Sequence, residues 1–169
     1  MKKIGLFYSF NTQNTAKSAE LIAKYLGEEQ VDKLNIEEIT DEQFLAYEFM
    51  ILGVPTWFDG ELPNYWDEFV PALEDMDLKG KTVAIFGHGD QIMYAQNFVD
   101  AIGIMADLVS ARGARLIGSH PITGYAFDQS FAVRKNQFAG LALDQENQPE
   151  LTEKRIRGWV NKIKKHLIS

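Results

Sequence analysis

Short apolar runs alternate with stretches of helical periodicity along the whole chain. The apolar runs have the length of buried strands and span residues 4–8, 31–34, 49–54, 83–86 and 116–118. The helical stretches repeat apolar residues every three or four positions and span residues 14–26, 62–73, 98–109 and 156–167. Continuous apolar strands separated by helices are typical of a parallel sheet that helices cover on both faces.

The pattern therefore predicts an α/β fold with a doubly wound, five-stranded parallel sheet. Residues 119–137 have no clean period and interrupt the fifth strand, whose apolar run resumes at 138–143. Thr40 and Gln43 have the spacing of a capping box and predict a short helix between the second and third strands. The chain contains no repeat and no linker, so we expect a single domain over residues 1–169.

Composition narrows the chemistry that this fold can carry. The 169-residue chain has no cysteine, which excludes disulfides, thiolate catalysis, cysteine-ligated zinc and iron–sulfur clusters. His88, His120 and His166 lack the spacing of a metal site, and we assign no role to the last two. Redox chemistry would therefore need an organic cofactor.

The net charge is −7, and the charged residues are unevenly distributed along the chain. Residues 35–78 contain twelve carboxylates and no Lys or Arg, whereas Lys and Arg crowd residues 154–165. This block indicates either an electrostatic docking surface or simply solvated helix faces. Nucleic acid is a poor candidate partner because phosphate backbones attract concentrated positive charge. The apolar run at 4–8 is too short to span a membrane, and we expect a cytoplasmic protein.

Ligands of doubly wound sheets bind at the carboxyl ends of the strands, where the winding reverses. The first loop there leads into the helix at 14–26, whose N-terminus would favour a phosphate; the alternative is ordinary capping by Asn14 or Thr12. The loop matches neither a Walker motif nor a dinucleotide fingerprint. Its hydroxyl- and amide-rich sequence is Ser9, Phe10, Asn11, Thr12, Gln13, Asn14 and Thr15.

Two further loops at the same edge carry aromatic side chains. Trp57 and Tyr94 could flank a flat, phosphate-tailed ligand, although each alone is also explained as a core lid or a surface aromatic. The candidate residues of the second loop are Pro55, Thr56, Trp57, Phe58, Asp59 and Gly60, followed by Glu61. Those of the third loop are Gly87, His88, Gly89, Asp90 and Tyr94.

The second and third loops carry the specific motifs Pro55-Thr56-Trp57 and Gly89-Asp90-Gln91-Ile92, and the resumed apolar run carries Gly140-Leu141-Ala142-Leu143-Asp144. With them, the chain resembles a cyanobacterial-type, long-chain flavodoxin over essentially its whole length. The resemblance implies the strand order 2-1-3-4-5 and a noncovalent FMN. It further implies that Trp57 and Tyr94 flank the isoalloxazine ring, that Asp90 lies near the pyrimidine edge, and that the Phe58–Gly60 backbone lies near N5. The first loop would hold the phosphate.

The first loop departs from the family pattern at three positions. Ser9 and Gln13 stand where the family has glycine, and Phe10 stands where it has threonine. A left-handed backbone at Gln13 would be strained, so we expect weakened phosphate binding. His88 replaces a usual threonine. One hypothesis is that it titrates near neutral pH and couples a proton to reduction; the alternative is that it only packs or hydrogen-bonds.

The resemblance implies a low-potential one-electron carrier that acts in place of ferredoxin and is not an enzyme. Its implied partners are redox proteins with basic docking surfaces: a ferredoxin-NADP reductase-type donor and a photosystem- or nitrogenase-type acceptor. We expect a monomer without nucleic-acid or membrane partners. The alternatives are an FMN-dependent quinone or nitro reductase on the same fold, and a flavin-poor interaction module if the altered loop no longer binds FMN.

Overall fold

The computed structural model describes residues 3–167, and its centre is a parallel sheet. Five strands lie in the spatial order β2-β1-β3-β4-β5, which confirms the predicted topology. Their bounds are β1 Ile4–Tyr8, β2 Val31–Asn35, β3 Phe49–Gly53, β4 Thr82–His88 and β5 Arg115–Ile117. The order reverses direction between β1 and β3, so the loops after these two strands lie at the switch point.

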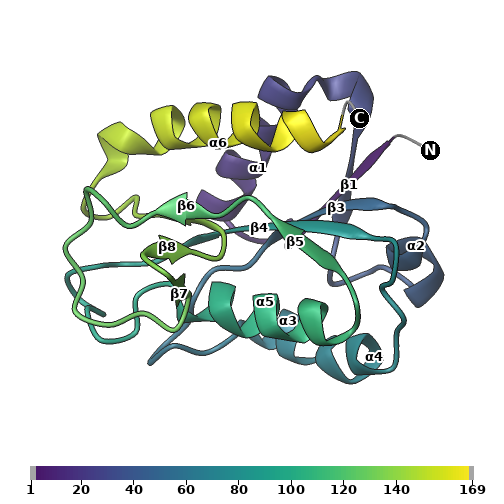
Figure 1. Cartoon of the computed structure of the whole chain (residues 1–169), viewed down its shortest axis with the longest axis horizontal. Helices are drawn as coiled ribbons and strands as arrows, with labels where there is room; N and C mark the ends of the chain where they lie inside the picture. Colours follow the sequence, from purple (N-terminus) through teal and green to yellow (C-terminus); the bar gives the residue numbers. More distant parts are fainter. Residues whose placement is uncertain (1–2, 168–169) are drawn as a thin grey trace.

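Helices cover both faces of the sheet, as Figure 1 shows. The helices α1 (Asn14–Leu26) and α6 (Thr152–Leu167) lie on one face, and α3 (Asn64–Asp67), α4 (Val70–Glu74) and α5 (Asp100–Ala111) lie on the other. The apolar positions expected to face the core are buried, among them Ile22 in α1 and Trp159 in α6. The apolar periodicity therefore identified the packed face of each long helix correctly.

The fifth strand is divided between two short strands that pair with successive parts of β4. β5 pairs with Thr82–Ala84, and β9 (Leu141–Leu143) pairs with Phe86–His88. The chain between them forms a small antiparallel sheet of β6 (His120–Pro121), β8 (Gln137–Phe138) and β7 (Val133–Arg134). The predicted interruption is confirmed, but the small sheet was not predicted because its strands are only two residues long.

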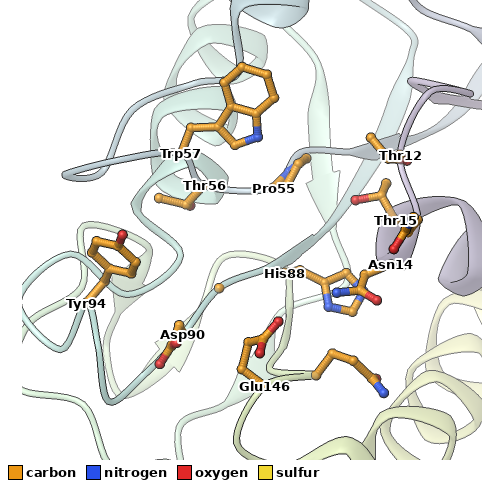
Figure 2. Close-up of a pocket in the computed structure, with 13 residues that line it drawn as sticks. Thr12, Asn14, Thr15, Pro55, Thr56, Trp57, His88, Asp90, Tyr94 and Glu146 are labelled. Carbon is orange, nitrogen blue, oxygen red and sulfur yellow. The ribbon is translucent and has the colours of Figure 1, made fainter.

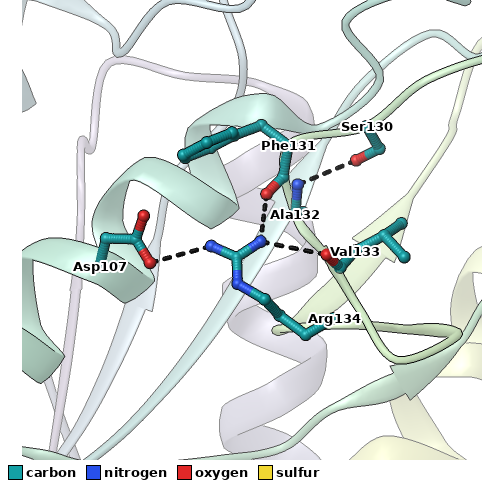
Figure 3. A network of polar contacts seen from close by, with 6 residues as sticks. All are labelled: Asp107, Ser130, Phe131, Ala132, Val133 and Arg134. Carbon is teal, nitrogen blue, oxygen red and sulfur yellow. Dashed lines mark hydrogen bonds and ion pairs between the residues drawn. The ribbon is translucent and has the colours of Figure 1, made fainter.

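The excursion between β5 and β9 is held against α5 by a polar cluster (Figure 3). Arg134 forms an ion pair with Asp107 at 2.9 Å and donates to the carbonyl oxygens of Phe131 and Val133. The Arg134 guanidinium also lies 5.2 Å from the centre of the Phe131 ring. This long loop is therefore attached to the helix that follows β4.

The observed bounds of two helices differ from the predicted ones. The stretch 62–73 forms α3 and α4 rather than one helix, because Pro71 has no N–H to donate and stands in the first turn of a new helix. The helix expected from residue 98 begins at Asp100, because Val99 has a left-handed backbone with φ 48°. The apolar run at 138–143 is likewise divided between β8 and β9.

The remaining elements are short. The capping box predicted for Thr40 and Gln43 is present at the start of α2 (Asp41–Leu45). Single 3-10 turns, η1 (Glu28–Gln30) and η2 (Pro149–Leu151), precede β2 and α6. Within residues 3–167, every helix is too short or too polar to cross a lipid bilayer.

Candidate functional site

A pocket of about 370 Å³ opens at the carboxyl ends of β1, β3 and β4 (Figure 2). Three loops that follow these strands contribute most of its lining, as expected. Of the predicted site residues, those that line it are Thr12, Gln13, Asn14, Thr15, Pro55, Thr56, Trp57, His88, Gly89, Asp90 and Tyr94. Gln145 and Glu146 line it as well. The predicted residues outside its lining are Ser9, Phe10, Asn11, Phe58, Asp59, Gly60 and Gly87.

Hydrogen bonds turn part of the first loop away from the pocket. The Ser9 hydroxyl donates to the Glu37 carboxylate, and the Asn11 amide donates to the same carboxylate oxygen at 3.0 Å. The Thr12 hydroxyl donates to the Ser9 carbonyl oxygen at 2.8 Å. Glu37 follows β2, so the neighbouring strand supplies the acceptor that engages Ser9 and Asn11. Their absence from the pocket follows from this contact.

The N-terminus of α1 has no side-chain cap. Gln13 is the N-cap residue, and its side chain makes no capping hydrogen bond, which contradicts the alternative of capping by Asn14 or Thr12. Gln13 has φ −97° and ψ −65°, a right-handed backbone, so the left-handed strain considered at this position does not occur. The first-turn N–H groups lie beside the pocket-lining Asn14 and Thr15 and offer donors and a positive dipole end to an anion.

The second loop is a tight turn. Trp57 and Glu61 exchange two backbone hydrogen bonds, of 2.9 and 2.8 Å. The enclosed tip uses left-handed backbone at Phe58 (φ 48°) and at Gly60 (φ 88°). A Cβ on Gly60 would lie 2.6 Å from a carboxylate oxygen of Asp100, so both the backbone and the space require glycine there.

Trp57 is supported by a second aromatic ring. Its indole lies edge-on to Tyr65, with the ring centres 5.7 Å apart. In Figure 2, Trp57 and Tyr94 lie on the side of the pocket away from α1, whereas Thr12, Asn14 and Thr15 lie at the opposite end. The pocket therefore has one aromatic end and one end rich in hydroxyls and amides.

Asp90 organises the third loop from within. Its carboxylate accepts from the N–H groups of Ile92 (3.0 Å) and Met93 (2.8 Å) and from the Asn147 amide (2.7 Å). Partial burial opposes ionisation, but these hydrogen bonds outweigh it and lower the pKa of Asp90. The Asp90 carbonyl oxygen also accepts from the Tyr94 N–H at 3.0 Å, so the same residue fixes the backbone that carries the aromatic ring.

A fourth loop, which follows β9, was missed from the sequence. Its Asp144 is fully buried and accepts hydrogen bonds from Gln91 and Asn147, which join it to the third loop. Gln145 and Glu146 then reach the pocket, and Figure 2 shows the Glu146 carboxylate between Asp90 and His88. The apolar run before this loop was a usable signal, since it ends at the same edge of the sheet.

His88 lies at the end of β4 and is only 9% exposed. Its Nε2 atom and the Ser18 hydroxyl of α1 are 2.8 Å apart, whereas its buried Nδ1 atom has no hydrogen-bond partner. Burial lowers the pKa of His88 to about 4, against the opposing effects of the Asn14 backbone and the Asp144 carboxylate. Without a ligand, the ring therefore does not titrate near neutral pH, and its coupling of a proton to flavin reduction stays a prediction.

Acidic side chains dominate the surroundings of the pocket. Its lining contains Asp90 and Glu146 and neither lysine nor arginine. All twelve carboxylates of residues 35–78 are exposed, and the ion pairs among residues 3–167 involve other acids. In the same described range, no cluster of three or more His, Asp or Glu side chains could hold a metal ion.

Comparisons with known proteins agree with this geometry. The flavodoxin family model matches residues 6–159. The chain is 48% identical to a flavodoxin from Synechocystis, with 97% of each chain covered. It is 42% identical to flavodoxin 1 of Escherichia coli, with 96% of this chain and 93% of the relative covered.

A solved structure is similar as well. The Fusobacterium nucleatum flavodoxin bound to flavin mononucleotide superimposes with a TM-score of 0.92 at 34% identity, and 98% of this chain and 99% of that chain are covered. The strand order, the pocket at the switch point and these similarities lead to one conclusion. This chain belongs to the flavodoxin family.

Proposed function

We propose that this protein carries single electrons between other proteins on a noncovalently bound FMN. The observation that carries the proposal is a single pocket with two chemically different ends. An uncapped helix N-terminus lies at one end, and Trp57 and Tyr94 lie at the other. Such a pocket suits a molecule with a phosphate on one end and a flat ring system on the other. Flavodoxins of known structure that resemble this chain are bound to flavin mononucleotide.

The residues present fit that cofactor. A volume of about 370 Å³ lies within the usual range of small-molecule sites. Donors for a phosphate are available from the side chains of Asn14 and Thr15, together with the first-turn N–H groups of α1, whereas the Thr12 hydroxyl is engaged by the Ser9 carbonyl oxygen. His88 lines the pocket, and its buried Nδ1 atom has no hydrogen-bond partner, although a buried polar atom of this kind is usually satisfied by some partner.

When bound, FMN supplies the one-electron chemistry, and the chain supplies position and electrostatics. Trp57 and Tyr94 would enclose the ring, and the Phe58–Gly60 turn would place backbone atoms against its reactive edge. Gly60 leaves that turn free to change its peptide orientation. Asp90 would lie near the pyrimidine edge of the flavin, because its carboxylate holds the third loop through the N–H groups of Ile92 and Met93.

The carboxylates around the pocket favour a low reduction potential. Asp59, Glu61, Asp90 and Glu146 oppose the addition of negative charge to a bound flavin. One carboxylate at about 10 Å, with an effective dielectric constant of about 20, contributes roughly 1.7 kcal/mol, or about 70 mV for one electron. We therefore infer a role like that of ferredoxin at the low end of the potential scale.

The exposed carboxylates of residues 35–78 also indicate what kind of protein would be a partner. The exposed acidic block would dock on redox proteins with basic surfaces, such as a ferredoxin-NADP reductase-type donor and a photosystem- or nitrogenase-type acceptor. We infer a cytoplasmic, single-domain monomer that acts as a carrier and not as an enzyme. The pocket is lined on the aromatic side by both Trp57 and Tyr94, which leaves little room for a second substrate against the ring.

Anaerobic titration of the purified protein with dithionite tests the proposal. The expected result is a flavin spectrum that changes in two separate one-electron steps. A single two-electron step would instead favour a quinone or nitro reductase. A protein that neither contains nor takes up FMN would contradict the proposal altogether.

A further inference from the structure

His88 is the one residue in the pocket lining that can carry a positive charge. The lining contains the carboxylates of Asp90 and Glu146 but neither lysine nor arginine. A phosphate dianion that enters this pocket would meet two negative side chains and a set of neutral donors. Neutral hydroxyl and amide donors stabilise an anion less than a charged donor does. Among the lining side chains, the His88 imidazole is therefore the one whose N–H donor can gain a positive charge when an anion binds.

The ring is already held in place by α1. The Ser18 hydroxyl lies 2.8 Å from Nε2, and 91% of the His88 surface is buried. This contact fixes the ring and leaves Nδ1 as a buried atom without a partner. An unsatisfied buried polar atom destabilises the fold, so a hydrogen-bond partner that arrives with a ligand would remove that cost.

The location of His88 indicates which part of the ligand it meets. Figure 2 shows its ring beside Asn14, at the end of the pocket where Thr12 and Thr15 also lie. The uncapped first turn of α1 begins at the same place. The aromatic end, where a flavin ring would stack, lies on the far side of the pocket. His88 therefore faces the phosphate end and not the ring end.

We propose that His88 recognises the phosphate group of FMN through its Nδ1 atom and makes this chain prefer FMN to riboflavin. The inference rests on the proposed function, because it assigns a residue to the phosphate of the same ligand. His88 compensates for Ser9 and Asn11, whose side chains are engaged by Glu37 and do not reach the pocket. Ser18 acts as the positioning residue for the ring.

The proposal also predicts how the ring titrates. Without a ligand, burial holds the ring neutral at neutral pH, since its pKa is about 4. The groups that face it are the uncharged Asn14 and Ser18 of α1, and the carboxylates of Asp144, Glu146 and Asp90 from the loops after β9 and β4. A phosphate in contact with Nδ1 favours the protonated ring, so the pKa of His88 rises when FMN binds.

Isothermal titration of the flavin-free full chain with FMN and with riboflavin at pH 7.5 tests the preference. The unaltered chain should bind FMN at least tenfold more tightly than riboflavin. In His88→Gln, the amide stands near the position of Nε2 and can keep the Ser18 contact, so the preference should fall several-fold. In His88→Asn, the amide stands near the position of Nδ1, and more of the preference should remain. His120→Asn removes a histidine outside the pocket and should change neither affinity.

A second measurement uses the unaltered chain, so it does not depend on whether a variant folds. Titration of the His88 ring by NMR should show a pKa at least one unit higher with FMN bound than with riboflavin bound. Equal pKa values in the two complexes, or an unchanged preference in His88→Gln, would overturn the role of His88 and leave FMN binding itself intact. Failure of the chain to bind either flavin would overturn the proposed function and this inference together.

Discussion

Burial keeps two histidines of this protein neutral well below neutral pH. It lowers the pKa of His88 to about 4. It also lowers the pKa of His120 to about 4, and the positive charges of Arg155 and Lys162 act in the same direction. Histidines in the unfolded chain titrate near 6.5. Both residues therefore link folding to pH.

The sign of that linkage gives a prediction for the flavin-free protein. Between about pH 6.5 and pH 4 the unfolded chain binds protons that folded His88 does not, so the free energy of unfolding falls as the pH falls. For His88 the loss over this range is about 3 kcal/mol at most. Urea unfolding at pH 7, 6, 5 and 4 would measure it. His88→Asn should flatten the dependence, and an equally steep dependence in that variant would contradict the assignment.

Backbone strain occurs at a different residue from the one that the sequence suggested. Replacement of a glycine made Gln13 the expected strained position, but its backbone is right-handed. The non-glycine residue of the second loop that has a left-handed backbone is Phe58, which is 68% exposed. A single sequence shows that a glycine is missing relative to a family pattern, but the conformation of the new loop depends on hydrogen bonds such as those from Ser9 and Asn11 to Glu37.

At the scale of elements, Asp144 joins the loop after β9 to the loop after β4. Its carboxylate accepts from the Gln91 N–H (3.0 Å) and amide (2.7 Å) and from the Asn147 N–H (3.0 Å). Gln91 and Asn147 thereby connect the two loops that border the pocket. This network positions Asp90, because Asn147 also donates to that carboxylate.

Asp144→Asn should therefore destabilise the protein and loosen the pocket. An asparagine keeps one acceptor oxygen and turns an NH₂ group toward the donors of Gln91 and Asn147. The expected loss is about 2–4 kcal/mol in the free energy of unfolding, measured by urea denaturation, with weaker FMN binding. The matched control is Asp128→Asn, at an exposed carboxylate that accepts from Gln96, where a change within about 0.5 kcal/mol is expected. Equal effects of the two variants would refute the role of the network.

Most of the sheet was predictable because its strands are continuous apolar runs, and α1 was predicted with the observed bounds. The short elements were not. Pro71 divides a stretch whose apolar period alone suggests one helix, and β6, β7 and β8 are too short to show any period. The pocket residues Gln145 and Glu146 were missed because their position depends on β9 pairing with the end of β4, a long-range contact.

The whole molecule is electrically polarised across its sheet. The acidic residues 35–78 include α3 and α4 on one face, whereas the basic residues of the chain end belong to α6 on the other face (Figure 1). All twelve carboxylates of the acidic block are exposed. The second pocket loop, with Asp59 and Glu61, belongs to the same acidic block. The electrostatic field of the protein therefore steers a positively charged partner toward the site.

Electron exchange with a basic redox partner should therefore slow as salt rises. We expect the second-order rate constant to fall several-fold between about 10 and 150 mM ionic strength, because the Debye length shrinks to about 8 Å. Stopped-flow measurements would show it. The double variant Asp59→Asn/Glu61→Gln should slow the reaction at low salt more than Asp75→Asn/Asp77→Asn, at the far end of the block. A rate without salt dependence, or equal effects of the two variants, would refute steering by the acidic block.

The division of the fifth strand also affects the tendency of the protein to associate with itself at high concentration. An open sheet edge is a template on which another chain can add a strand, and long, regular edges promote self-association. Here one edge is made of β5 and β9, each only three residues long, which border different halves of β4. The other edge, β2, carries Asp32 and Lys33. Neither edge offers a long apolar ladder, so we expect little tendency to form fibrils at high protein concentration.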